Sequence, residues 1–196
     1  MDAGDRENRS EVGRQKKALR RELLATLKAI TPAERLRSDA LILQALRGMP
    51  SYQQASRLFL YVGTAWEVDT RPLIEEALAA GKQVAVPRCL PLGIMEACLI
   101  RNLDELRLVP PLGLWEPEEG APVIEPALLD FAVIPCVACD RSGQRLGRGG
   151  GYYDRFLAEQ SFTKAALCRQ AVLQDSLPTE AFDQRVDYVV TDGGIV

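Results

Sequence analysis

The first regular pattern of apolar residues begins after residue 13. From Arg14 to Ile30, apolar side chains recur at every third or fourth position, which is the spacing of one face of an α-helix. Residues 1–13 carry too few apolar side chains to bury against a core. The pattern therefore predicts a flexible N-terminal tail over residues 1–13 and a single domain over residues 14–196.

A second helix is predicted over residues 32–47. Thr31 and Glu34 form a capping box around Pro32, a residue that favours the first helical position, and Gly48 provides a helix stop. We expect the apolar residues of this segment to pack on the first helix. These residues are Leu36, Ala40, Leu43 and Leu46.

After these helices the pattern changes to short apolar runs typical of buried strands. Residues 57–62 and 83–87 are two such runs, and residues 70–80 between them have helical spacing that ends at Gly81. A right-handed crossover of this kind makes its two strands parallel. Ligands of parallel sheets gather beyond the carboxyl ends of the strands, so the loop after the first strand is a candidate site.

Strands dominate the second half of the chain. Residues 95–100 predict a strand and residues 102–108 a short helix or turn. Prolines recur over residues 109–126, which predicts an irregular excursion without a regular element. Further strands are predicted at residues 129–137, 165–172 and 186–191, with a helix at residues 152–160. The order of elements indicates an α/β domain in which two helices precede the sheet.

A glycine-rich stretch over residues 144–157 is the strongest candidate for a binding site. Glycines at 147, 149, 150 and 151 run directly into the predicted helix. Glycine lets backbone N–H groups approach a ligand closely, and a helix N-terminus favours anions such as phosphate. The alternative is an ordinary turn, but three consecutive glycines lose much conformational entropy on folding. The stretch lacks the Lys-Ser/Thr of a Walker A loop and the spacing of a dinucleotide fingerprint.

Charged residues beside the glycines strengthen the anion hypothesis. Arg148 stands inside the stretch, whereas Asp154 would repel a bound phosphate unless a cation lay between them. That conflict indicates a metal ion. Lys16 and Arg20 share one face of the first helix near its N-terminus, where positive charge is poorly placed for the helix dipole. They form either a solvated basic face or part of an anion site.

Composition narrows the possible functions. The net charge of −3 gives no reason to expect binding to nucleic acid or to a membrane surface. No apolar run approaches the length of a membrane span, and residues 1–17 are too polar for a signal peptide, so we expect a cytoplasmic protein. The absence of histidine excludes Ser-His-Asp, Cys-His and HExxH chemistry. Catalysis would use carboxylates, Lys or Arg, a metal, or the reactivity of the substrate itself.

The five cysteines are expected to be buried free thiols. Their number is odd, and they are spread through apolar stretches. Cys136 and Cys139 have the spacing of a redox or metal pair, but the chain has neither a second close pair nor a histidine to complete a zinc site. The sequence therefore favours packing over function for this pair.

The motifs taken together resemble the 5-formyltetrahydrofolate cyclo-ligase family, also called 5,10-methenyltetrahydrofolate synthetases. The resemblance covers nearly the whole chain. It rests on residues 16–20, the Trp66-Glu-Val-Asp-Thr70 loop, Val86-Pro-Arg88, the Gly113-Leu-Trp-Glu-Pro117 segment, Asp140 with Gly143, residues 145–155 and Arg185-Val-Asp187.

The resemblance implies a fold, a reaction and cofactors. The fold would be a three-layer α/β/α domain with a mainly parallel sheet, of the NagB/ribose-5-phosphate isomerase/CoA-transferase type. The enzyme would use ATP and Mg²⁺ to convert 5-formyltetrahydrofolate to 5,10-methenyltetrahydrofolate, through phosphorylation of the formyl oxygen and ring closure by N10. We expect a monomer with a small-molecule substrate.

The resemblance also implies roles for individual residues. Arg148, Lys16 and Arg20 would be catalytic, and Asp154 and Asp187 would hold Mg²⁺. The implied ATP-binding residues are Lys16, Lys17, Ala18, Leu19, Arg20, Arg145, Leu146, Gly147, Arg148, Gly149, Gly150, Gly151, Tyr152 and Tyr153. The implied folate-binding residues are Val62, Glu67, Arg148, Gly149, Gly150, Gly151 and Tyr152. Trp66, Trp115 or Tyr152 would stack on the pterin ring, an assignment that rests on aromatic chemistry alone.

Two other readings remain open at this point. One is a non-catalytic nucleotide- or polyanion-binding regulatory module, against which the joint presence of the implied catalytic and metal residues argues. The other, a sugar-phosphate isomerase or CoA transferase, follows from the implied fold alone.

Overall fold

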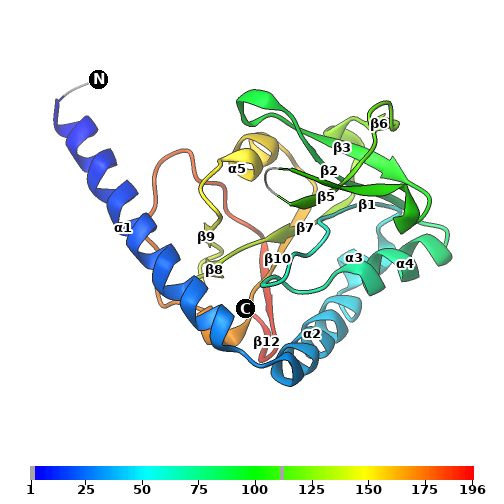
Figure 1. Ribbon diagram of the computed structural model, residues 1–196, viewed down its shortest axis with the longest axis horizontal. Coiled ribbons are helices and arrows are strands. Elements are labelled where there is room, and N and C mark those ends of the chain that lie inside the picture. Colours follow the sequence, from blue (N-terminus) through cyan, green and yellow to red (C-terminus); the bar gives the residue numbers. More distant parts are fainter. Residues whose placement is uncertain (1–2, 111–112) are drawn as a thin grey trace.

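A computed structural model describes residues 3–110 and 113–196 of the chain. Its centre is an eight-stranded sheet with the strand order β12-β11-β10-β7-β1-β2-β3-β6 (Figure 1). The five inner strands, all parallel, are β11 (Tyr188–Thr191), β10 (Thr163–Leu167), β7 (Phe131–Pro135), β1 (Arg57–Leu60) and β2 (Gln83–Cys89). The antiparallel outer strands are β12 (Gly194–Ile195), β3 (Met95–Ile100) and β6 (Val123–Ile124). The predicted mainly parallel sheet is confirmed, as is the parallel pairing of the first two strands.

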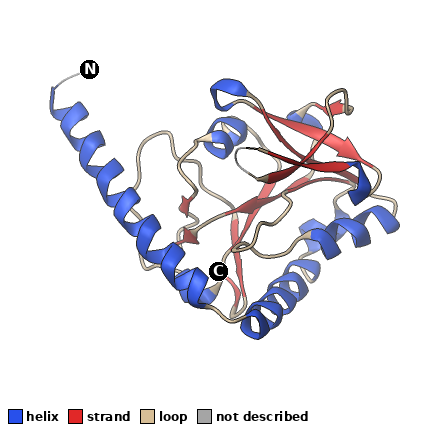
Figure 2. Ribbon diagram, in the orientation of Figure 1, coloured by secondary structure: helices blue, strands red, loops and turns tan. Residues whose placement is uncertain are grey.

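Helices cover both faces of the sheet, because alternate side chains of its inner strands point to opposite sides. Leu58 and Leu60 of β1 pack with the helices of one face, whereas Phe59 packs with those of the other. The first face carries α2 (Pro32–Arg47), α3 (Pro50–Gln54) and α4 (Arg71–Ala79). The second carries α1 (Ala3–Ala29) and α5 (Tyr152–Leu157). The result is a helix, sheet, helix arrangement of three layers (Figure 2).

The second helix has its predicted bounds but not its predicted packing. Thr31 and Glu34 form the capping box, and the helix ends before Gly48. However, α2 packs against β11 and β12, on the face opposite α1. Leu36, which we expected at a contact with the first helix, is 72% exposed. The prediction that the two helices pack together is therefore wrong, because the turn at residues 30–31 carries the chain to the other face of the sheet.

The first helix begins at Ala3, not near Arg14 as the apolar pattern predicted. A helix needs no apolar face where it extends away from the body, since its hydrogen bonds are internal. Glu11 accepts hydrogen bonds from Arg14 and Gln15, one turn further along, and such pairs support an exposed helix. The flexibility expected for residues 1–13 stays a prediction, and residues 1 and 2 lie outside the described residues.

The proline-rich segment contains regular structure that we did not predict. Strands β4 (Leu106–Val109) and β5 (Leu114–Pro117) form an antiparallel hairpin, and β6 lies within the same stretch. Pro110 follows β4 directly and Pro117 is the last residue of β5, positions where a missing N–H breaks no ladder. The prediction of an irregular excursion over residues 109–126 is therefore wrong for the described part of this segment.

Short elements complete the fold. The expected short helix or turn at residues 102–108 is a 3₁₀ turn, η2 (Leu103–Glu105), followed by β4. The other 3₁₀ turns are η1 (Pro91–Gly93), η3 (Pro126–Leu128) and η4 (Gln170–Val172). A small hairpin of β8 (Ala138–Cys139) and β9 (Arg145–Leu146) was not predicted. Across the described residues, no helix combines the length and apolar character that a membrane span requires.

Candidate active site

A cavity of about 390 Å³ opens at the carboxyl ends of β1, β2 and β7. Its floor includes Tyr61 and Val62 after β1, Cys89 at the end of β2, and Pro135 with Cys136 at the end of β7. This is the edge of the sheet at which the strand, helix, strand unit predicted a ligand site. The loop between β1 and α4 contributes Glu67 to the wall.

The glycine-rich stretch forms one wall of the cavity. It leaves the β8–β9 hairpin, whose turn is held by Asp140 as it accepts hydrogen bonds from the backbone N–H groups of Ser142 and Gln144. Gly149 has a φ of 99° and Gly151 a φ of 69°, values that side chains with a Cβ rarely adopt. The glycines are therefore required by the backbone path into α5.

The backbone donors of this wall are unused. Among the described residues, the N–H groups of residues 148–151 donate no hydrogen bond. Two carbonyl groups of the same loop are occupied, since Gly147 accepts from Arg20 at 2.7 Å and Gly150 from Arg155 at 2.7 Å. The loop is thus held in place through its carbonyl groups, and the N–H groups of residues 148–151 stay available to bind an anion.

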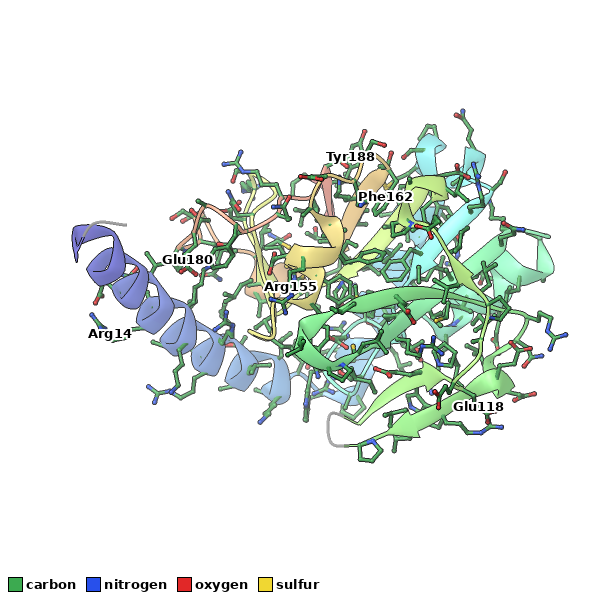
Figure 3. The ribbon with its side chains drawn as sticks, turned by 90° about the horizontal axis from the view of Figure 1, so that it is seen from above. Arg14, Glu118, Arg155, Phe162, Glu180 and Tyr188 are labelled. Atoms are coloured by element: carbon green, nitrogen blue, oxygen red, sulfur yellow. The ribbon has the colours of Figure 1, made fainter. Side chains whose placement is uncertain are left out.

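The basic turn of α1, residues 16–20, meets the glycine wall, residues 147–151. Arg20 is joined to it by the hydrogen bond to Gly147, and Lys16, only 6% exposed, lines the same cavity. The Lys16 ammonium group forms ion pairs with Glu180 at 2.9 Å and Asp183 at 2.5 Å. Glu180 lies on the segment that passes beside α1 (Figure 3). The structure therefore brings Lys16 and Arg20 together with the glycines, and the solvated basic face is not what these two residues form.

Arg148 and Glu67 face each other across the cavity mouth. The Arg148 Nε atom lies 3.3 Å from Glu67 Oε1, and its guanidinium also donates to the Thr64 hydroxyl. Glu67 in turn accepts from the backbone N–H of Thr64 at 2.9 Å. The 63–70 loop and the glycine loop are thus linked by one salt bridge.

Asp154 is neutralised by a buried arginine. Arg145 Nη2 lies 2.9 Å from Asp154 Oδ1, which also accepts from the backbone N–H of Gln184 at 3.3 Å. Both of the hydrogen bonds that Asp154 accepts within the described chain go to Oδ1. The Arg145 side chain is 3% exposed and that of Asp154 21%, so the arginine of this pair is held away from solvent.

Acids outnumber bases in the cavity wall. Among the described lining residues, the bases are Lys16, Arg20, Arg145 and Arg148, and the acids are Glu67, Glu116, Asp154, Glu180 and Asp183. Four cations against five anions leave no spare positive charge for a polyanion. A multiply charged phosphate ligand would therefore have to displace an acid from its partner or bring a cation with it.

Several of the residues proposed from the sequence do not reach the cavity. Asp187 stands before β11, at the amino end of the parallel strands, and its carboxylate accepts from the Lys164 backbone N–H at 2.7 Å. Asp187 and Asp154 thus lie at opposite ends of the parallel strands. Trp66 packs outside the cavity lining, with the Arg35 guanidinium 4.7 Å from its ring centroid. Lys17, Ala18 and Leu19 are also absent from the described lining.

The two remaining aromatic candidates line the cavity. Trp115, in β5, is 43% exposed, and Tyr152 begins α5 and donates its hydroxyl hydrogen to Leu90 O at 3.2 Å. Tyr153 lies deeper, where burial raises its pKa well above the usual value for a phenol. Tyr153 therefore stays a neutral donor at any pH near neutrality.

Sequence reasoning missed three acids of the site. Glu180 and Asp183 lie in a segment without regular structure and without a recognisable motif, so no sequence signal pointed to them. Glu116 is 5% exposed and accepts from the Cys89 backbone N–H at 3.3 Å. It belongs to the Gly113–Pro117 segment, where an acid between Trp115 and a proline was a usable signal.

All five cysteines are free, as the sequence predicted. Cys136, Cys139 and Cys168 lie together behind the cavity. Hydrogen bonds from the thiols of Cys136 and Cys139 lower the pKa of Cys168 well below its usual value. A hydrogen bond with the Cys139 thiol, together with one to Cys168 and burial, raises the pKa of Cys136 well above its usual value.

Comparison with known proteins points to one family. The model of the 5-formyltetrahydrofolate cyclo-ligase family matches residues 12–192. The 5-formyltetrahydrofolate cyclo-ligase of Mus musculus is 30% identical over 91% of this chain and 94% of its own, and that of Escherichia coli K12 is 30% identical over 84% and 93%. The solved structure of the Aquifex aeolicus 5,10-methenyltetrahydrofolate synthetase superposes with a TM-score of 0.81 at 28% identity, covering 92% of this chain and 91% of that one.

Proposed function

The chain belongs to the 5-formyltetrahydrofolate cyclo-ligase family, and from this membership we infer that it is a ligase that converts 5-formyltetrahydrofolate to 5,10-methenyltetrahydrofolate. We propose that ATP drives the reaction and that the triphosphate binds the glycine wall. The observation that carries this proposal is the row of unused N–H donors at residues 148–151, flanked by Lys16 and Arg20. Such donors, with lysine and arginine, are what a triphosphate requires.

The chemistry suits a site without histidine. A formamide carbon is a poor electrophile, so the γ-phosphoryl group of ATP is transferred to the formyl oxygen, with ADP as the leaving group. The N10 atom of the folate then attacks the activated carbon and loses its proton, and phosphate leaves as the methenyl ring closes. Phosphoryl transfer requires positioning and charge neutralisation more than a protein nucleophile.

Arg148 has the position of a residue that serves both substrates. It stands in the glycine wall and pairs with Glu67, the acid that we assign to the pterin. When a phosphate approaches, the guanidinium exchanges its carboxylate partner for phosphate oxygens, and Glu67 is released to accept from pterin N–H donors. Trp115 and Tyr152, which line the same cavity, are the aromatic rings available to stack on the pterin.

Mg²⁺ fits one of the two acids that the resemblance implied. Asp154 lines the cavity and keeps Oδ2 outside the hydrogen bonds that its Oδ1 accepts, whereas Asp187 lies at the opposite edge of the sheet. Mg²⁺ characteristically binds one or two carboxylates together with substrate phosphates. We therefore propose that Asp154 alone contacts the ion, which would neutralise charge on the β- and γ-phosphates. The acid excess of the wall supports this need for a cation.

The test is the absorbance of the methenyl product. The protein is incubated with 5-formyltetrahydrofolate and Mg·ATP, and a methenyl absorption should develop that is absent without ATP or with an ATP analogue that cannot transfer its γ-phosphoryl group. Absence of an ATP-dependent signal from folded protein would contradict the proposal. Nucleotide binding without product would indicate the regulatory alternative. The monomeric state and the cytoplasmic location stay predictions.

A further inference from the structure

Three cysteines from separate parts of the chain converge behind the cavity. Cys136 follows β7, Cys139 ends β8 and Cys168 follows β10, and their sulfur atoms all lie within 4.8 Å of one another. The register explains the third member, because Leu167 pairs with Pro135 in the β10–β7 ladder and so places Cys168 beside Cys136. The fold thus adds Cys168 to the pair of Cys136 and Cys139, a neighbour that the spacing in the sequence could not reveal.

The cluster is open on one side only. Cys139 and Cys168 are at most 1% exposed, whereas Cys136 is half-buried and lines the cavity. Three thiolates about 2.3 Å from one ion lie roughly 4 Å from one another, a spacing within the limit that these sulfurs meet. A small adjustment of side-chain rotamers is therefore enough to bring them to a common ion.

The electrostatic surroundings favour thiolate ligands. Arg145 is paired with Cys139 in the β8–β9 register and carries a buried guanidinium. Its Nε atom is buried and has no hydrogen-bond partner among the described residues. A buried cation on the neighbouring strand offsets part of the negative charge that three thiolates bring to one metal ion.

We propose that Cys136, Cys139 and Cys168 form a binding site for a thiophilic d¹⁰ dication such as Zn²⁺. The ion takes three sulfur ligands from the protein, and its fourth position is filled by water from the cavity that Cys136 lines. Binding of the ion releases thiol protons from the cysteines, so the affinity for the ion falls as the pH is lowered. The sulfur ligands distinguish this site from the proposed Mg²⁺ position, because Mg²⁺ prefers oxygen ligands.

Cadmium is the direct probe, because thiolate-to-metal charge transfer gives it an ultraviolet absorption. The reduced protein, kept in a phosphine reductant without nucleotide, is titrated with Cd²⁺, and Zn²⁺ is then measured by competition with a chromophoric chelator. We expect saturation at one ion per chain, displacement of Cd²⁺ by Zn²⁺, and no displacement by excess Mg²⁺. This readout does not involve the proposed reaction, so the two proposals succeed or fail independently.

Matched variants locate the site. Cys136→Ser changes the half-buried member and should weaken Cd²⁺ binding by more than about tenfold, since loss of even an outer partner of a metal site costs about 10–100-fold. Cys168→Ala tests the member from β10. Cys89→Ser is the control, because Cys89 lines the same cavity but lies outside the cluster. Circular dichroism and urea unfolding confirm that each variant is folded.

Two outcomes would overturn the proposal. One is a wild-type titration without charge-transfer absorption at one equivalent of Cd²⁺. The other is an affinity in the folded Cys136→Ser variant equal to that of the wild type or of Cys89→Ser. Either result would reduce the cluster to three packed thiols.

Discussion

Arg148 is the residue at which the two proposed ligands meet, so its replacement separates catalysis from folding. It is exposed, and within the described residues its side chain bonds only to side chains of the 63–70 loop, so Arg148→Ala should leave the fold intact. Loss of a charge-stabilising group at phosphoryl transfer should lower kcat by about 10²–10³. The measurement is steady-state kinetics of methenyl formation. Arg141→Ala, an exposed arginine in the Asp140 turn, is the control, and equal kinetics for both variants would reject the role of Arg148.

Lys16 and Lys17 are neighbours in sequence with different surroundings. Lys16 is buried in the cavity wall between Glu180 and Asp183, whereas Lys17 is exposed and outside the described lining. Lys16→Ala removes a charged hydrogen bond to phosphate and should raise the KM for ATP roughly 10–100-fold. Lys17→Ala should have a much smaller effect. A larger effect from Lys17 would contradict the placement of Lys16 in the ATP site.

At the scale of single residues, the sequence identified basic candidates for the site but not the acidic residues that form ion pairs with them. Arg148 was a candidate because it stands inside the glycine stretch, whereas Lys16 and Arg20 of the first helix became candidates through the family resemblance. Their acidic partners were not found, because Glu180 and Asp183 are 160 or more positions from Lys16 and no periodic pattern relates them. Asp187 shows the reverse error, since its place at the amino end of β11 follows from strand direction and not from its neighbours in sequence.

A single arginine ties three elements together on the helical side of the site. Arg169, just after β10, forms an ion pair with Asp39 of α2 at 2.7 Å and donates to the carbonyl groups of Arg35 and Glu67. The Arg169 side chain is 4% exposed and that of Asp39 15%. This arrangement fixes the backbone at Glu67, so the orientation of the candidate pterin acid depends on α2.

Removing Asp39 should therefore destabilise the fold. Asp39→Ala leaves the buried Arg169 charge without its partner and should lower the free energy of unfolding by about 3 kcal/mol in urea denaturation. The control is Glu76→Ala, which breaks an exposed ion pair between α4 and Arg47 and should cost less than about 1 kcal/mol. Similar losses from the two variants would contradict the importance of burial.

The ion pair between Asp39 and Arg169 should also make the stability of the fold depend on pH. Burial raises the pKa of Asp39 in spite of Arg169, so the folded state holds this proton more firmly than the unfolded state. The contribution of Asp39 to stability therefore falls as the pH rises from the unfolded pKa through the folded one. Asp39→Asn keeps the shape of the side chain without the titration, and it should remove this part of the pH dependence. An unchanged profile would mean that other groups produce it.

Element prediction succeeded where local signals are strong and failed where packing decides. The Thr31 capping box and Gly48 gave α2 its bounds, yet the face of the sheet that α2 covers depends on the turn before it. The β4–β5 hairpin was missed because prolines suggest disorder of the backbone, although at strand ends they are compatible with pairing. The β8–β9 hairpin was too short for any periodicity to appear.

At the scale of the whole molecule, the proposed ATP site joins two segments that are distant in sequence. The basic turn of α1 and the glycine wall lie more than 120 positions apart and are linked by the Arg20 bond to Gly147. The helices α2, α3 and α4 cover the other face of the sheet. A ligand that bridges the first two should protect both against local opening, whereas the opposite face should gain only the protection that comes from the higher free energy of global unfolding.

Hydrogen exchange with Mg·ATP tests this coupling. At a ligand concentration about 100 times the Kd, binding to the folded state alone adds about 2.7 kcal/mol to the free energy of unfolding. Amides of residues 147–152 and of α1 around residues 16–23 should both gain protection, because Lys16 exchanges Glu180 and Asp183 for phosphate oxygens while the N–H groups of the wall become occupied. In Lys16→Ala the wall should still gain protection but α1 should gain less. Protection confined to the glycine wall of the wild type would contradict a two-sided clamp, since the triphosphate would then be held without the basic turn.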